Sequence, residues 1–385
     1  MSSHRGSPMS KQIPLFEIPW DETDISNVVE SISRGSYWAK GPFVDQFEEG
    51  LESYFNIDHA VSMNSGTTAL VAALEACGIG PGDEVIVPSF TFIATANVVE
   101  LVGAEPVFAD IESESFGLDP ESVEAKITDN TAAIVPVHVY GTPCRIHEIT
   151  EIADENDLWV IEDAAEAFGA TADGELAGTV GDIGALSFCQ NKILPTGEGG
   201  AVITADPELA AKASQFSNHG RVKGDYFGSV DSGAYESVGS NYRMPDMVAA
   251  VGCSQLAKVD ELIDSRRAVA ARYDDGLSEI SEVEPHKPVD GSDHVYQLYT
   301  VRFETEAVRS HVIDTLTDRN ISCKIYWDPP LHRNGVFTAE SQPPLPQTDD
   351  MSSRVLSLPM YPTLRLTDVD RVVRAIRDGI VAGSE

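Results

Sequence analysis

Short apolar, often β-branched runs alternate with longer amphipathic stretches over the first two-thirds of the chain. Runs of this length and composition are typical of buried strands. We expect strands at 59–63, 84–87, 106–108, 132–137, 158–161, 184–188 and 200–204. Helix-like segments fall between them at 67–77, 92–102, 120–127 and 146–156. Alternation of strands and helices predicts an α/β fold, in which a mostly parallel, mixed sheet is flanked by helices on both faces.

The apolar pattern changes on both sides of this region. Phe43, Phe47, Leu51 and Phe55 recur every four residues behind Gly41, which predicts a helix with one apolar stripe before the first strand. After the last predicted strand of the sheet, a long helical pattern at about 247–277 is expected to lead out of the first domain as a linking helix.

The C-terminal third has a sparser pattern, with a strand near 295–303 and helices near 307–319 and 368–380. This is typical of a smaller α+β domain. With 385 residues the chain is long enough for two cores. We expect an N-terminal arm at 1–20, a large domain at 21–255 and a small domain at 256–385.

The most unusual feature of the composition is the large excess of acidic over basic residues. The chain has 62 Asp and Glu against 26 Lys and Arg, a formal net charge of −36 spread along its whole length. We interpret this as adaptation to concentrated salt, because at about 1 M the Debye length falls to about 3 Å and self-repulsion is screened. The alternative is an acidic enzyme from a mesophilic organism that is not adapted to concentrated salt. Nucleic-acid binding is disfavoured, because there is no basic stripe to offset phosphate repulsion.

The sequence also predicts a location. Residues 1–8 lack the apolar core of a signal peptide, and no apolar run approaches the length of a membrane span. Five cysteines are scattered without C-x-x-C spacing. We therefore expect reduced thiols in a cytoplasmic protein, with no disulfide framework, no metal site and no membrane partner.

Two residues predict the chemistry. Asp163 closes the apolar stretch 158–161, and Lys192 lies in a glycine-rich segment further along the chain. A lysine amine can form an imine with an aldehyde cofactor, while a carboxylate on the far side of the ring keeps a pyridine nitrogen protonated. Pyridoxal 5'-phosphate is the cofactor that has both an aldehyde and a pyridine nitrogen. The alternative for a lone lysine is a solvated surface charge.

Three further segments could complete such a site. Asn64 to Thr68 follow the first strand and open a helix, so their amides and hydroxyls suit a phosphate, although a capped helix after a glycine turn is the simpler interpretation. Phe92 could lie flat on a cofactor ring or belong to the core. Ser187 precedes the lysine loop, and its hydroxyl could reach the same phosphate.

Together these segments carry a resemblance. The motifs are S-G-T-T-A-L (65–70), P-S-F-T-F (88–92), E-D-A-A-E-A-F-G-A (162–170), S-F-x-x-x-K (187–192), T-G-E-G-G (196–200), N-Y-R-M (241–244) and P-P-L-H (329–332). In this order they resemble the DegT/DnrJ/EryC1/StrS family. The resemblance implies a fold-type I pyridoxal phosphate-dependent transferase that moves an amino group, with glutamate as donor, to a nucleotide-linked keto sugar.

The resemblance also implies roles for individual residues. Lys192 would hold the cofactor as an internal aldimine and then move the proton, while Asp163 would pair with the ring nitrogen. The other cofactor contacts would be Gly66, Thr67, Phe92, Glu166, Ser187 and Asn241. Of these, Asn241 would reach across from the neighbouring subunit of a homodimer whose active sites lie at the interface.

The resemblance implies substrate contacts at two positions. Tyr326 and His332 would line the sugar pocket, although a half-buried tyrosine and a loop histidine are the simpler alternatives. An acidic enzyme also needs local cations to bind a diphosphate. The candidates are Arg221, Lys223, Arg243 and Arg333.

Glu166 and Asn191 indicate which branch of the family this chain resembles. Many family members carry Gln or His where this chain has Glu166, and Asn191 directly precedes the lysine. Both features resemble the perosamine synthase-like branch, which aminates C4 of 4-keto-6-deoxyhexoses. Amination at C3, a cyclitol substrate and a non-catalytic regulatory protein remain the alternatives.

Overall fold

The structure is a computed structural model that describes residues 11–223, 230, 233–337 and 344–383. At its centre lies a seven-stranded sheet. In sheet order the strands are β1 (His59–Met63), β9 (Gly200–Thr204), β8 (Ile183–Ser187), β5 (Trp159–Asp163), β4 (Thr131–Ile134), β2 (Glu84–Pro88) and β3 (Glu105–Ala109). Only β9 runs against the others, since it pairs antiparallel with both β1 and β8 while the remaining pairs are parallel. The predicted mostly parallel, mixed sheet of an α/β fold is therefore confirmed.

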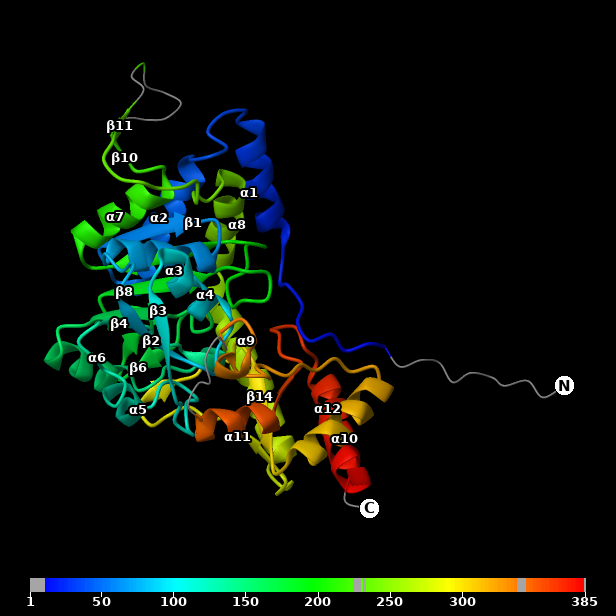
Figure 1. Cartoon of the computed structure of the whole chain (residues 1–385). Coiled ribbons are helices and arrows are strands. Elements are labelled where there is room, and N and C mark those ends of the chain that lie inside the picture. The colour runs from blue at the N-terminus through cyan, green and yellow to red at the C-terminus, as the bar shows by residue number, and fades with distance from the viewer. Residues whose placement is uncertain (1–10, 224–229, 231–232, 338–343, 384–385) are drawn as a thin grey trace.

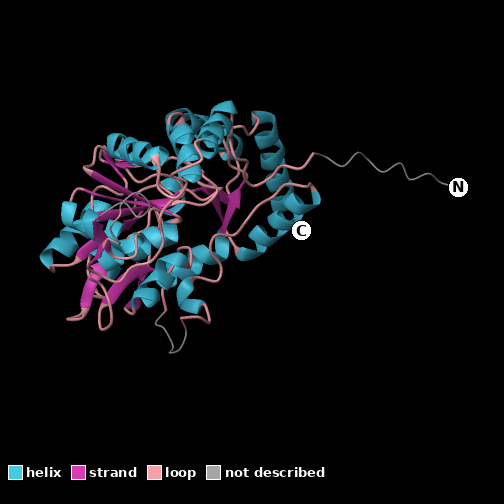
Figure 2. Ribbon diagram, turned by 90° about the horizontal axis from the view of Figure 1, so that it is seen from above, coloured by secondary structure: helices cyan, strands magenta, loops and turns pink. Residues whose placement is uncertain are grey.

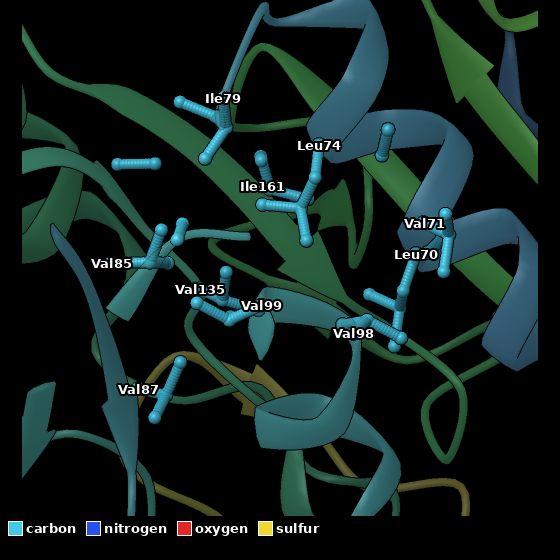
Figure 3. Close-up of a cluster of buried hydrophobic side chains, with 14 of the residues drawn as sticks. Leu70, Val71, Leu74, Ile79, Val85, Val87, Val98, Val99, Val135 and Ile161 are labelled. Carbon is cyan, nitrogen blue, oxygen red and sulfur yellow. The ribbon is translucent and has the colours of Figure 1, made fainter. Parts of the chain in front are cut away.

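Helices cover both faces of this sheet, because its strands are apolar on both sides (Figure 2). In β2, Val85 and Val87 belong to one buried cluster and Ile86 to another. The first cluster is packed under α3 (Gly66–Ala76), α4 (Ala94–Val102) and α7 (Pro207–Ser217). Figure 3 shows part of it, with side chains of Leu70, Leu74, Val98 and Val99 from α3 and α4 close to those of Val85, Val87 and Ile161 from the sheet.

The remaining helices of this part lie over the opposite face or beside it. They are α1 (Glu22–Ser33), α2 (Pro42–Phe55), α5 (Pro120–Glu124), α6 (Ile146–Glu155) and α8 (Asp246–Leu256). The predicted stripe of α2 is buried: Phe47 and Leu51 are fully inaccessible to solvent. Helix α8 packs between α1 and α2. The N-terminal third of the chain is thereby fixed against the sheet that carries the chemistry.

A second group of elements has its own apolar core, to one side of the large sheet in Figure 1. Its three-stranded antiparallel sheet consists of β12 (Val283–Pro285), β14 (Tyr299–Phe303) and β15 (Val355–Leu358). Its helices are α9 (Val259–Leu277), α10 (Glu306–Asp318), α11 (Pro346–Arg354) and α12 (Leu366–Gly383). We propose that these elements form the predicted smaller α+β domain.

Several short elements complete the description. They are β6 (Thr171–Ala172), β7 (Glu175–Leu176), β10 (Arg221–Lys223), β11 (Ala234–Tyr235) and β13 (Ser292–Asp293), with single-turn helices at Val139–Gly141 and Leu331–Arg333. Sequence patterns did not indicate these pieces, because two or three residues cannot establish a period.

The linking helix predicted over about 247–277 is two helices, since α8 ends at Leu256 and α9 begins at Val259. Lys258 leaves the helical conformation at the break, with φ −120° and ψ 8°. Its ammonium donates to Asp21 Oδ2 at 2.6 Å and Asp24 Oδ2 at 2.8 Å. The prediction of one helix was wrong because this ion pair to the start of α1 holds a turn that the apolar pattern does not show.

The predicted arm at 1–20 is only partly described, because residues 1–10 lie outside the described residues. Beyond them the chain is fixed by the small core. Ile13 is 1% exposed, its N–H donates to Asn320 O at 3.1 Å, and its carbonyl accepts from Ser322 N at 2.9 Å. This segment therefore joins the small core before the chain returns to α1.

Two other features of the described residues bear on the sequence analysis. No helix among them is both long and apolar enough to cross a bilayer. All five cysteines are free thiols. Burial raises the pKa of both Cys77 and Cys253 to about 12, with nearby carboxylates contributing in the same direction, so neither is a reactive thiolate near neutral pH.

The excess acid lies largely in solvent. Helix α6, for example, exposes Glu148, Glu151, Asp154 and Glu155 on its outer side. Like charges three or four residues apart on a helix destabilise it unless salt screens them. We propose that this acidic shell is an adaptation to concentrated salt.

We predict that the thermal unfolding midpoint rises as KCl increases from about 0.1 M to about 1 M, because the Debye length falls from about 10 Å to about 3 Å. Calorimetry on the purified protein measures this midpoint. Sucrose is the control, because it is excluded from protein surfaces without screening charge and should stabilise less. A midpoint that is flat or falls with KCl would contradict the proposal.

Candidate active site

A cavity of about 410 Å³ lies at the carboxyl ends of β5 and β8, where ligands gather in open α/β sheets. Of the residues predicted from sequence, its wall contains Gly66, Thr67, Phe92, Asp163, Glu166, Ser187, Lys192 and Tyr326. A larger hollow of about 640 Å³ near 284–290 contains none of them. The topology of the sheet thus brings together segments that are far apart in the sequence.

Asp163 is the last residue of β5 and is 5% exposed. Thr95 Oγ1 donates to its Oδ2 at 2.9 Å, and the Ala165 amide donates to its Oδ1 at 3.2 Å. Burial raises the pKa of this carboxyl, while these two hydrogen bonds and the charge of Lys192 lower it in part. A carboxyl whose pKa is raised by folding stabilises the protein at low pH, and this contribution is lost as the pH rises through the folded-state pKa. A cationic ligand group beside Asp163 would favour the ionised form of this carboxyl.

Lys192 is held in a closed loop between β8 and β9. Its amide donates to Cys189 O at 2.9 Å, so the chain turns at the lysine. The side chain is 14% exposed, and Nζ donates to Glu166 Oε1 at 3.2 Å. The other carboxylate oxygen of Glu166 accepts from the Tyr140 amide at 3.0 Å. Glu166 therefore orients the lysine amine from the turn that follows β5.

An anion cradle lies at the start of α3. Ser65 caps the helix by accepting from Thr68 N at 3.1 Å, and N–H groups of a first helical turn have no acceptor within their own helix. A Cβ on Gly66 would lie 2.7 Å from Ser187 Cβ, so only glycine lets the helix start approach the hydroxyl of Ser187. Backbone amides and a hydroxyl therefore surround a position suited to a phosphate.

Phe92 is 59% exposed and forms part of the cavity wall. A large apolar ring left open inside a cavity is suited to stacking against a flat ligand. The same cavity holds an amine, a buried carboxylate and an anion cradle. This set of groups fits pyridoxal phosphate, since it offers one partner for the aldehyde, one for the ring nitrogen, one for the ring face and one for the phosphate.

His332 does not lie on the cavity wall. It is 1% exposed, its Nδ1 is 2.6 Å from Ser89 Oγ, and its Nε2 is 3.2 Å from Asp349 Oδ1. The Ser89 hydroxyl also accepts from the His332 amide at 2.9 Å. In the described chain this histidine fastens the segment after Pro330 to the end of β2, and its position gives no support to the predicted sugar contact.

The predicted cations also lie away from the cavity. Arg243 donates to Asn218 Oδ1 at 2.7 Å, Arg221 donates to the Tyr235 hydroxyl at 2.9 Å, and Arg333 forms a two-pronged pair with Asp349 at 3.1 and 2.7 Å. The side chain of Lys223 lies outside the described residues. None of the three described arginines supports the predicted role, because each is directed at a partner outside the cavity.

Asn241 is exposed and does not line the cavity of its own chain. Its backbone pairs with Asn218 at the edge of the segment that leads to Arg243. This position leaves its predicted contact to be made by a neighbouring subunit.

Four further residues belong to the site although no sequence pattern predicted them. Thr95 binds Asp163, the Tyr140 amide binds Glu166, and Lys324 and Trp327 line the cavity. Thr95 lies one helical turn after the P-S-F-T-F motif, so helical spacing from Phe92 could have indicated it. The others arrive through loops whose approach to the sheet no local pattern encodes.

Comparisons with known proteins agree with this geometry. The model of the DegT/DnrJ/EryC1/StrS aminotransferase family matches residues 19–377. The GDP-perosamine synthase of Caulobacter vibrioides is 39% identical over 365 residues, covering 94% of this chain and 96% of the relative. The dTDP-3-amino-3,4,6-trideoxy-alpha-D-glucose transaminase of Streptomyces venezuelae is 38% identical over 389 residues, covering 98% of each.

Solved structures show the same similarity. S. venezuelae DesV has a TM-score of 0.88 at 35% identity, covering 95% of this chain and 98% of that one. The putative sugar aminotransferase Spr1654 of Streptococcus pneumoniae, solved in its PLP form, has a TM-score of 0.90 at 26% identity, covering 97% and 99%. The chain therefore belongs to the DegT/DnrJ/EryC1/StrS aminotransferase family and is a pyridoxal phosphate-dependent aminotransferase.

Proposed function

We propose that this enzyme transfers an amino group from glutamate to C4 of a nucleotide-linked 4-keto-6-deoxyhexose. The observation that carries the chemistry is the placement of Lys192 and Asp163 on the wall of one cavity, each largely shielded from solvent. The substrate class rests on the relatives, among which enzymes from three organisms are named GDP-perosamine synthase. We keep Gly66, Thr67, Phe92, Ser187 and Glu166 as the proposed cofactor contacts.

Each residue of the site has a separate role in the proposed reaction. When bound, pyridoxal phosphate supplies an electron-withdrawing ring that acidifies the substrate C–H bond. Lys192 Nζ would take the proton from the carbon of the donor and return a proton to the carbon of the sugar. Glu166 holds that amine in place at 3.2 Å, and Asp163 would keep the ring nitrogen protonated. Tyr326 reaches the same cavity and is the proposed sugar contact.

Glu166 and Asn191 favour C4 over C3, because both resemble the perosamine synthase-like branch. Glu166 contacts Lys192 and Asn191 lines the cavity, which supports a role for both near the reacting carbon. Amination at C3 is the second candidate, since the S. venezuelae relative named a 3-amino sugar transaminase is 38% identical.

The holoenzyme, incubated with glutamate and a panel of 4-keto and 3-keto nucleotide sugars, should yield a product aminated at C4, identified by mass spectrometry and NMR. Lys192→Ala should give no product, because the variant lacks the amine that binds the cofactor aldehyde and moves the proton in the proposed reaction. Lys212→Ala, which alters an exposed lysine on α7, is the matched control and should behave as wild type. An amine at C3 would establish the second candidate, and no product from any nucleotide sugar would contradict the substrate class.

We further propose that the enzyme is a homodimer with its active sites at the interface. Helix α1 exposes Ile25, Val29 and Ile32, which recur at helical spacing and are between 45% and 56% exposed. An apolar helix face of this kind is typical of a protein interface. The same face borders a groove that includes Pro195 and Gly197 from the lysine loop. A second subunit on this face would therefore lie beside the active site.

A heterodimer tests whether Asn241 acts across the interface. Subunits carrying Asn241→Ala and subunits carrying Lys192→Ala are co-expressed with different tags, and the heterodimer is purified. If Asn241 serves the partner's site, one of the two sites is intact and activity should return to about half of wild type in this symmetric arrangement. A heterodimer as inactive as its parents, or an Asn241→Ala homodimer with full activity, would contradict the proposal.

A further inference from the structure

The charge around the cavity is unfavourable for an anionic substrate. Asp163, Glu166 and Glu198 all contribute to its wall, in a protein whose formal net charge is −36. Among the described residues that line it, only Lys192 and Lys324 carry positive charge. Lys192 already contacts Glu166 at 3.2 Å. Lys324 is therefore the cation in this wall that remains for a substrate anion.

The backbone of Lys324 is rigidly placed. Its N–H donates to Ser357 O at 3.1 Å, and its carbonyl accepts from Ser357 N at 2.8 Å, which ties it to strand β15. Its ammonium lies over the ring of Tyr326, 4.8 Å from the ring centroid. Across residues 11–223, 233–337 and 344–383, no ion pair within 4.0 Å involves it. The lysine is thus oriented by an aromatic face while its charge remains unpaired.

We infer that Lys324 binds the diphosphate of the nucleotide sugar and so determines specificity for that class of substrate; this inference rests on the proposed function. Lys324 is exposed, whereas Lys192 and Asp163 are shielded, so Lys324 lies on the outer side of the cavity. The diphosphate is attached at the anomeric carbon, away from the keto carbon that must reach Lys192. It therefore extends toward the outer side, where a point charge on a flexible stem suits a phosphate.

The carboxylate of the amino donor is the competing anion. The α-carboxylate of an amino acid is one bond from the carbon that reacts, so it must lie beside Lys192 in the shielded part of the cavity. It also carries one negative charge, whereas the diphosphate of a nucleotide sugar carries two. Both considerations favour the diphosphate as the partner of an exposed lysine in an acidic surrounding.

Calorimetric titration of the holoenzyme with GDP, UDP and dTDP, at one fixed KCl concentration, tests this assignment. For the nucleotide that wild type binds most tightly, Lys324→Met should weaken binding by about tenfold, the effect expected from losing a charged hydrogen bond. Lys324→Arg should stay within about threefold, because it keeps the charge. Lys212→Met, at an exposed lysine paired with Glu208, is the matched control and should not change the affinity.

A second measurement separates the two anions. The release of 2-oxoglutarate in a single turnover with glutamate alone should be within about twofold of wild type in Lys324→Met, because the donor carboxylate does not depend on Lys324. Unchanged nucleotide affinity in Lys324→Met, or an equal loss in the glutamate half-reaction, would overturn the assignment while leaving the aminotransferase intact. Failure of wild type to bind any of the three nucleotides would overturn the nucleotide-sugar substrate itself, and Lys324's role with it.

Discussion

The site depends on one unfavourable feature, the burial of the carboxylate of Asp163. Strand β5 carries it to the carboxyl edge of the sheet, and Thr95 and the Ala165 amide hold its two oxygens. Neither donor neutralises the charge, and burial leaves the pKa of this carboxyl raised. In the proposed function a protonated pyridine nitrogen would remove this penalty, because an ion pair stabilises a buried charge that hydrogen bonds alone do not. Lys192, Glu166 and Gly66 line the same cavity as Asp163.

The fold follows closely from the sequence because its strands are buried on both faces and therefore read as continuous apolar runs. All seven strands predicted for the large domain occur in the central sheet. Asp163 at the end of β5 and Lys192 in the loop after β8 line one cavity, as predicted. Prediction failed where tertiary contacts overrode local pattern. Lys258 breaks the linking helix through its ion pairs with α1, and His332 is drawn into a buried contact with Ser89. No spacing rule encodes such distant partners.

Two lysines in the cavity wall oppose the acidic charge of the rest of this enzyme. The whole chain is strongly acidic, yet both substrates in the proposed reaction are anions. Arginines that the sequence offered for this purpose are engaged elsewhere, Arg333 with Asp349 being the clearest case. The positive charge instead comes from lysines on two different elements, Lys192 on the loop after β8 and Lys324 beside β15. The large sheet thus supplies the chemistry, and the smaller one supplies a cation at the edge of the cavity.

The role of Asp163 is tested most directly by unfolding midpoints of apoenzyme and holoenzyme at neutral pH. The account predicts that added pyridoxal phosphate raises the midpoint of wild type more than that of Asp163→Asn, because the variant cannot place a carboxylate against the ring nitrogen. Asp182→Asn is the control: burial also raises the pKa of Asp182, which accepts from Val160 N outside the cavity, so the gain from the cofactor should be unchanged. Equal stabilisation of wild type and Asp163→Asn by the cofactor would contradict the account.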